Sequence, residues 1–121
     1  MSNAAQAYSR TSQITGNARE IEAQALLKAA KQLRDVQSNW AGPDAKMHKA
    51  LLFNRRLWTI FMSAAEDNDN PHSIEVRQNI ANISIFVMHQ TVDMQLAPDP
   101  SKLKPLIDIN CQIAAGLAGR V

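Results

Sequence analysis

The sequence predicts an all-α fold, a compact single domain of about five helices in mostly antiparallel, bundle-like packing. Apolar residues recur every three or four positions through long stretches, the spacing of one face of an α-helix. Turn-forming residues separate these stretches at Gly42-Pro43, at residues 67–71 and at Pro98 and Pro100. The connections are short, so consecutive helices are expected to lie antiparallel. A chain of 121 residues is the usual size of one domain, here taken as residues 1–121.

The first two predicted helices are separated at Gly16. Residues 3–13 favour a helix weakly through their alanines, and Gly16 is expected to end it. Asn17 lies three residues before Glu20, which predicts an N-cap with its reciprocal partner and a second helix of about 20 residues. The weak pattern of residues 1–16 and their terminal position favour mobility, with docking on the domain or exchange between chains as the alternatives.

The second predicted helix carries apolar residues on two sides. Its main stripe consists of Ile21, Ala25, Ala29, Leu33, Val36 and Trp40. A smaller ridge away from that stripe consists of Ala23, Leu27 and Ala30.

Three further helices are expected after the Gly-Pro turn. In order, they run from Asp44 as a cap towards Ala65, from Ser73 to about Leu96, and from Ser101 to Gly116 or Gly119. The β-branched run at residues 83–87 is typical of a strand, but the helical spacing continues on both sides of it, so a helix is predicted there too.

Asparagines fall on the apolar sides of three helices. On helical wheels Asn54 and Asn110 lie at the centre of such a face, and Asn79 lies at the edge of one made by Val76, Ile80, Val87 and Met94. A buried amide without a partner costs about 1–3 kcal/mol, so each should be hydrogen-bonded. One interpretation is a buried network that fixes the register of the helices; the other is a set of polar anchors in a groove that binds a partner.

The fourth helix also carries a second apolar ridge. It consists of Ala81, Ile85, Met88, Val92 and Leu96, and polar residues including Arg77 and Ser84 separate it from the first face. A helix that is apolar on two sides is either central in the fold or presents one side to a partner. The simplest such partner is an amphipathic helix laid in a groove, with Leu27 and Ile85 on the contacting ridges.

No catalytic, cofactor or metal site is predicted. The four glycines are scattered singly, and the nucleophile-elbow, CxxC and HExxH patterns are absent. His48, His72 and His89 lie on three separate segments without clustered carboxylates. Cys111 borders the apolar side of its helix, which favours a packed, inert thiol over a catalytic one.

The composition is that of a cytoplasmic protein. A single cysteine allows no internal disulfide, no apolar run approaches the roughly 20 residues of a membrane span, and no signal-peptide core is visible. Residues 1–56 hold nine Lys/Arg and four Asp/Glu, whereas residues 57–121 hold four and seven. The charge asymmetry is mild. The more basic amino-terminal half carries Lys28, Lys31 and Arg34 but no aromatic platform on which bases could stack, so direct RNA binding is not expected.

Several strings along the chain, taken together, resemble one family. They are Asn3-Ala-Ala-Gln-Ala-Tyr8, Arg19-Glu-Ile-Glu-Ala23, Ala50-Leu-Leu-Phe-Asn-Arg-Arg-Leu-Trp-Thr-Ile-Phe61, Asp69-Asn-Pro71, Val76-Arg-Gln-Asn-Ile-Ala-Asn82, Leu106-Ile-Asp-Ile-Asn110 and Ile113-Ala-Ala-Gly-Leu117. In content and order they resemble the FlaF family, small regulators of flagellar biosynthesis in alphaproteobacteria. The resemblance spans essentially the whole chain.

The resemblance implies a non-enzymatic factor that acts between the synthesis and the export of flagellin. The function expected from it is a secretion chaperone that binds flagellin and couples its synthesis to export. The alternative is a regulatory adaptor that binds the regulator FlbT and modulates translation of flagellin messenger RNA without holding flagellin. The residues expected at the partner surface, from the wheels and the family strings, are Leu27, Asn54, Arg55, Trp58, Arg77, Asn79, Asn82, Ile85 and Asn110.

Overall fold

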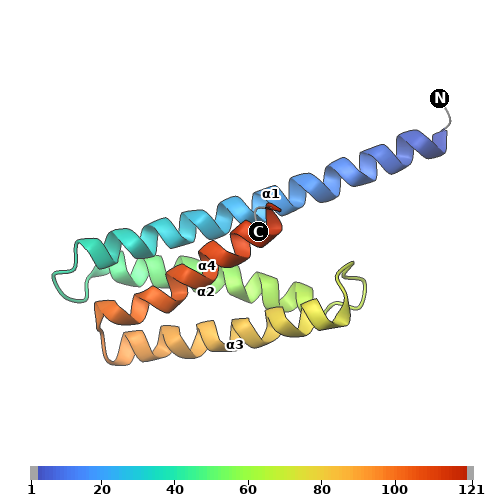
Figure 1. Ribbon diagram of the computed structural model, residues 1–121. Coiled ribbons are helices and arrows are strands. Elements are labelled where there is room, and N and C mark those ends of the chain that lie inside the picture. Colours follow the sequence, from blue (N-terminus) through green and yellow to red (C-terminus); the bar gives the residue numbers. More distant parts are fainter. Residues whose placement is uncertain (1–2, 120–121) are drawn as a thin grey trace.

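The computed structural model describes residues 3–119, with side chains from Ala18 onward, and this part of the chain is all-α. It contains α1 (Asn3–Ser38), α2 (Ala45–Glu66), α3 (Ile74–Leu96), the short 3-10 helix η1 (Pro100–Lys102) and α4 (Leu103–Leu117) (Figure 1). The predicted fold class is confirmed, with one helix fewer than the five expected.

The difference arises at Gly16, where a break between two helices was predicted. α1 instead runs without interruption from Asn3 through Gly16 and Asn17. A glycine inside a helix costs only about 1 kcal/mol relative to alanine, which the helix-favouring residues on both sides outweigh. Asn17 is therefore not an N-cap. Residues 1–2 and the side chains of residues 3–17 lie outside the described part, so the mobility expected for residues 1–16 stays a prediction.

The other helix starts follow the predicted capping residues. Asp44 Oδ1 accepts a hydrogen bond from the Met47 N–H (2.9 Å), and Ser73 Oγ accepts one from the Val76 N–H (3.2 Å). Each satisfies a backbone donor that the first turn of a helix leaves free. The last predicted start differs: Asp99 caps η1, and α4 then starts at Leu103 with Lys102 at its N-cap position and no side-chain cap.

The helices pack unequally around one core. α1 and α4, the first and last helices, lie side by side and make the most extensive contact, and α2 packs on both α1 and α3 (Figure 1). α3 and α4 contact each other only slightly. α3 accordingly supplies only Val87 and Met94 to a core whose other members are Ala23, Leu26, Ala30, Leu33, Met47, Ala50, Leu51, Trp58, Leu103, Leu106, Ile107 and Ala114.

The buried face of α1 differs from the predicted stripe. Ala23 and Ala30, expected on a separate ridge, are fully buried with Leu26, whereas Ile21 is exposed and Leu27 is half-buried against the core. The reason is that α1 packs against two helices, α2 and α4, and so buries a wide face that takes residues from both predicted stripes.

The buried stripe of α3 also differs, because two polar residues lie in it. Ser84 and Thr91 are buried, and each hydroxyl donates to the carbonyl four residues earlier, on Ile80 and Val87 (2.7 Å each). A small hydroxyl that is satisfied within its own helix can enter a core at little cost. The apolar residues beside this stripe are therefore left on the two flanks of α3.

Candidate functional site

An apolar groove lies between the amino-terminal half of α3 and the carboxyl-terminal half of α4. Its volume is about 590 Å³. Five apolar side chains line it: Val76, Ile80 and Ile83 from α3, and Ile113 and Leu117 from α4. The polar lining consists of Asn79, Asn82 and Gln112, with Arg19 of α1 and His72 of the α2–α3 loop.

The groove exists because α3 and α4 diverge from a common corner. The two helices are close where η1 joins them, and α4 then rises towards α1 while α3 stays along α2 (Figure 1). Beneath the opening, Trp58 and Phe61 of α2 border a smaller cavity of about 40 Å³. That cavity shares Ile80, Ile113 and Leu117 with the groove, so α2 forms the floor.

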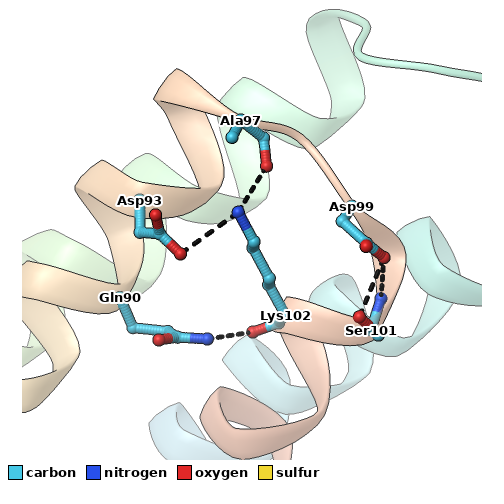
Figure 2. A network of polar contacts seen from close by, with 6 residues as sticks. All are labelled: Gln90, Asp93, Ala97, Asp99, Ser101 and Lys102. Carbon is cyan, nitrogen blue, oxygen red and sulfur yellow. Dashed lines mark hydrogen bonds and ion pairs between the residues drawn. The ribbon is translucent and has the colours of Figure 1, made fainter.

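Lys102 holds the corner where α3 and α4 meet. Its Nζ donates to the Ala97 carbonyl (2.7 Å) and forms an ion pair with Asp93 Oδ2 (3.1 Å), while Gln90 Nε2 donates to the Lys102 carbonyl (2.9 Å) (Figure 2). The Lys102 ammonium satisfies a backbone carbonyl at the end of α3, and the Gln90 carboxamide ties α3 to the start of the last helix. The corner therefore fixes where the two walls begin to diverge.

Asp99 completes the same corner through Ser101. Its Oδ1 accepts hydrogen bonds from the backbone N–H (2.9 Å) and the hydroxyl (2.8 Å) of Ser101 (Figure 2). These two hydrogen bonds, with a smaller contribution from the positive charge of Lys102, lower the pKa of the Asp99 carboxyl from its ordinary value. The carboxylate is thus the form that the corner stabilises.

A buried hydrogen-bond network joins the α4 wall to the floor. Trp58 Nε1 donates to Asn110 Oδ1 (2.9 Å), and Asn110 Nδ2 donates to Asn54 Oδ1 (2.7 Å). All three side chains are fully buried, and the rings of Trp58 and Phe61 pack edge to face with 5.3 Å between their centroids. Asn54 Nδ2 has no partner among the described residues. The network sets the position of α4 on α2.

Arg77 joins the α3 wall to the end of α2. Its Nε donates to the Ala65 carbonyl (2.8 Å). In the loop between these helices, Asn70 Nδ2 donates to the Ala64 carbonyl and Asn70 Oδ1 accepts from the His72 N–H, both at 2.8 Å. His72 is held in this way at the end of the groove.

The residues predicted for the partner surface separate into three groups. Asn79 and Asn82 line the groove and are exposed, so Asn79 is not a core-face residue as its wheel position suggested. The second group does not line the groove but makes the hydrogen bonds that hold its walls and floor together: Asn54, Trp58, Arg77 and Asn110. For Asn54 and Asn110 this is the structural network, one of the two interpretations that the sequence left open.

The third group lies away from the groove. Arg55 is exposed on α2, Leu27 is half-buried on α1, and Ile85 lies 45% exposed on the other flank of α3. The structure therefore does not bring Leu27 and Ile85 together on one contacting surface, as the ridge argument expected.

Several groove residues were not anticipated from the sequence. Val76, Ile113, Leu117, Gln112 and Arg19 were not among the residues expected at the partner surface. Helical periodicity identifies an apolar face but does not say whether a neighbouring helix covers it. The sequence feature that could have indicated the groove is the turn at Pro98 and Pro100, because a turn of this kind allows the two helices to diverge.

Gly116 leaves the α4 wall open. A Cβ atom placed there would meet no heavy atom within 4 Å, and the residue faces the groove. A larger side chain at this position can therefore enter the groove without disturbing the core.

Among the residues with described side chains, nothing indicates a metal site or a membrane-spanning helix. There, no three His, Cys, Asp or Glu side chains gather closely enough to bind a metal ion. None of the described helices combines the length and hydropathy needed to cross a membrane.

Comparison with protein families matches this chain to the model described as "Flagellar protein FlaF" over residues 4–117. The matched range takes in α2, α3 and α4, nearly all of α1, and both walls of the groove. No curated protein and no solved structure matches the chain.

Proposed function

Because the chain belongs to the FlaF family of flagellar proteins, we propose that it is a non-enzymatic flagellar biogenesis factor that binds flagellin as a secretion chaperone and couples flagellin synthesis to export. It would act in the cytoplasm, where flagellin is made. The observation that carries this proposal is the apolar groove between α3 and α4.

The shape of the groove suits a helical segment. Its walls are two helices that diverge from one corner, its floor is apolar, and the α3 wall runs from Val76 to Ile83. At 1.5 Å per residue this wall is about 10 Å long, roughly two turns of a bound helix. An amphipathic helix would place apolar residues at spacings of three and four along the groove.

Flagellin offers such segments before it assembles. Its helical ends are exposed in the unpolymerised subunit, and covering their apolar faces would prevent premature association while leaving the subunit competent for export. Exposed apolar faces of this kind are what a holding chaperone must shield.

The chemistry of the groove predicts that binding depends little on salt. The carboxamides of Asn79, Asn82 and Gln112 can donate to and accept from polar side chains without carrying charge, and Arg19 and His72 lie at one end only. Affinity should therefore change little between about 50 and 500 mM salt, whereas phosphate binding would weaken steeply over that range.

Calorimetric titration of monomeric flagellin tests the proposal. We expect 1:1 binding at micromolar affinity or tighter, with a negative heat-capacity change from burial of apolar surface. Gly116→Trp should weaken binding at least about tenfold, since the indole occupies the groove. Ser63→Trp is the matched control, because Ser63 is exposed on α2 outside the groove. Circular dichroism should show both variants folded.

Repeating the titration with FlbT separates the chaperone from the adaptor. A change in flagellin affinity when FlbT is present would show that the two partners are thermodynamically linked through this protein. Failure of flagellin to bind, together with a stable FlbT complex, would overturn the chaperone proposal in favour of the adaptor.

A further inference from the structure

The outer flank of α3, opposite the groove, is apolar and uncharged. No Asp, Glu, Lys or Arg occurs between Arg77 and Asp93, and α3 packs chiefly on α2. An exposed helix face normally carries charged residues. Ile85 is 45% exposed and Val92 48% exposed on this flank.

The side chains on this flank follow the spacing of a coiled-coil seam. We define the outer seam as Gln78, Ala81, Ile85, Met88, Val92 and Gln95. Their spacings are three, four, three, four and three residues, the alternation of a and d positions in a heptad repeat. Ala81 and Met88 are half-buried, and the other four are exposed. Leu96, 80% exposed, extends the apolar surface at one end.

The seam has the same pattern in both directions. Reversing the helix places a carboxamide at each end and four apolar residues between them, at unchanged spacing. A surface that matches its own reverse is what a two-fold symmetric contact between identical chains requires.

We propose that a second copy of this chain packs on the outer seam, with the two α3 helices antiparallel. Ile85 of one copy then faces Met88 of the other, Ala81 faces Val92, and Gln78 faces Gln95. The small Ala81 lies opposite a β-branched side chain, and the two glutamines close each end of the apolar contact with a pair of amides.

The side-chain sizes along the seam favour the antiparallel orientation. Antiparallel packing places the small Ala81 opposite Val92, whereas parallel packing places the two Ala81 side chains opposite each other and leaves a gap there. The charged residues that bound the stretch, Arg77 and Asp93, are held within their own chain by the Ala65 carbonyl and by Lys102, so they do not set the orientation. The groove lies on the other flank of α3, so both grooves stay accessible in the dimer.

The size of the seam predicts a weak, concentration-dependent dimer. From Gln78 to Gln95 the helix is about 26 Å long, a single helix pair of two and a half heptads. Such a contact buries less than the roughly 800 Å² per partner of a typical stable interface. We therefore expect exchange between one-chain and two-chain masses over the micromolar to millimolar range.

Sedimentation velocity over that concentration range tests the dimer. The unmodified chain should shift from the mass of one chain to that of two, and Ile85→Asp should abolish the shift. Gly116→Trp, which fills the groove, should leave the shift unchanged. A single-chain mass for the unmodified protein at millimolar concentration would overturn the proposal.

Disulfide cross-linking tests the orientation, in a Cys111→Ser background so that each variant carries one thiol. Ala81→Cys and Val92→Cys should each cross-link poorly alone and efficiently when mixed. In the antiparallel pair the two copies of position 81 are offset by eleven residues, about 16 Å along the axis, too far for a disulfide. Efficient cross-linking of each variant with itself would indicate parallel packing and contradict the proposal.

A third readout distinguishes a second copy from a different partner. If Ile85→Asp weakens flagellin binding while the unmodified chain stays monomeric, the seam is part of the flagellin surface and the dimer proposal fails. The groove proposal is tested separately by Gly116→Trp, so failure of one leaves the other measurable.

Discussion

Asn54 and Asn110 have the same side chain as Asn79 and Asn82, yet the two pairs have opposite surroundings. The first pair is buried between α2 and α4, where Asn110 donates to Asn54 and accepts from Trp58, whereas the second pair is exposed on α3 in the groove. The side-chain chemistry is identical, so the neighbouring helix decides what each amide does. A covered amide fixes the position of a helix, and an uncovered amide is available to a partner.

The largest expected effect is on stability, from Asn110→Ala. The change removes two buried hydrogen bonds and leaves Trp58 Nε1 and Asn54 Oδ1 without partners. At about 1–3 kcal/mol for each unsatisfied group, the free energy of unfolding should fall by about 2–6 kcal/mol. Urea unfolding followed by circular dichroism measures it.

Asn54→Ala sharpens the same comparison. Asn54 makes one hydrogen bond in the network, and its Nδ2 is already without a partner, so its removal should cost less than the removal of Asn110. If Asn54→Ala lowered the free energy of unfolding as much as Asn110→Ala or more, the hydrogen-bond network would not be the reason for the loss of stability.

The second largest effect is expected on flagellin binding, in the double variant that carries both Asn79→Ala and Asn82→Ala. Both residues are exposed, so unfolding free energy should change by no more than about 0.5 kcal/mol per site. Flagellin affinity should fall about tenfold, since each lost hydrogen bond is worth about 0.5–1.5 kcal/mol. Titration calorimetry provides the measurement, with Asn68→Ala in the exposed α2–α3 loop as the control. An unchanged affinity for flagellin would show that flagellin does not bind at these two asparagines in the groove.

The smallest effect concerns the corner that sets the angle between the groove walls. Lys102→Met removes the bond to the Ala97 carbonyl and the ion pair with Asp93, which should cost about 1 kcal/mol. Lys104→Met is the matched control, because the Lys104–Asp108 pair is solvent-exposed and links positions within one helix. It should cost less than about 0.5 kcal/mol. Amide hydrogen exchange should show faster opening near residues 90–97 for Lys102→Met alone.

The sequence predicts the fold class and most helix ends because those depend on local chemistry. Asp44 and Ser73 cap helices where expected, and the β-like run at residues 83–87 is helical because its surroundings are. The prediction of a helix break at Gly16 was wrong, because one glycine does not end a helix that has helix-favouring residues on both sides.

The candidate site could be predicted only in part, because it depends on which helix faces are covered. Asn79 and Asn82 were expected at a partner surface and line the groove. Ile113 and Leu117 have the same helical spacing as the buried Leu106 and Ala114, and only the divergence of α4 from α3 leaves them uncovered. That angle is set by long-range contacts such as the one between Trp58 and Asn110, which no local pattern contains.

The pairing of α1 with α4 has a consequence for the order in which the molecule forms. The most extensive helix contact joins segments far apart in the chain, so loop closure must bring them together before that contact contributes. During synthesis, α1, α2 and α3 leave the ribosome before α4, and until α4 docks Trp58 lacks its acceptor and one wall of the groove is missing. The groove is thus the last part of the fold to be completed. A nascent chain without α4 has no groove, so a partner can be captured there only after folding has finished.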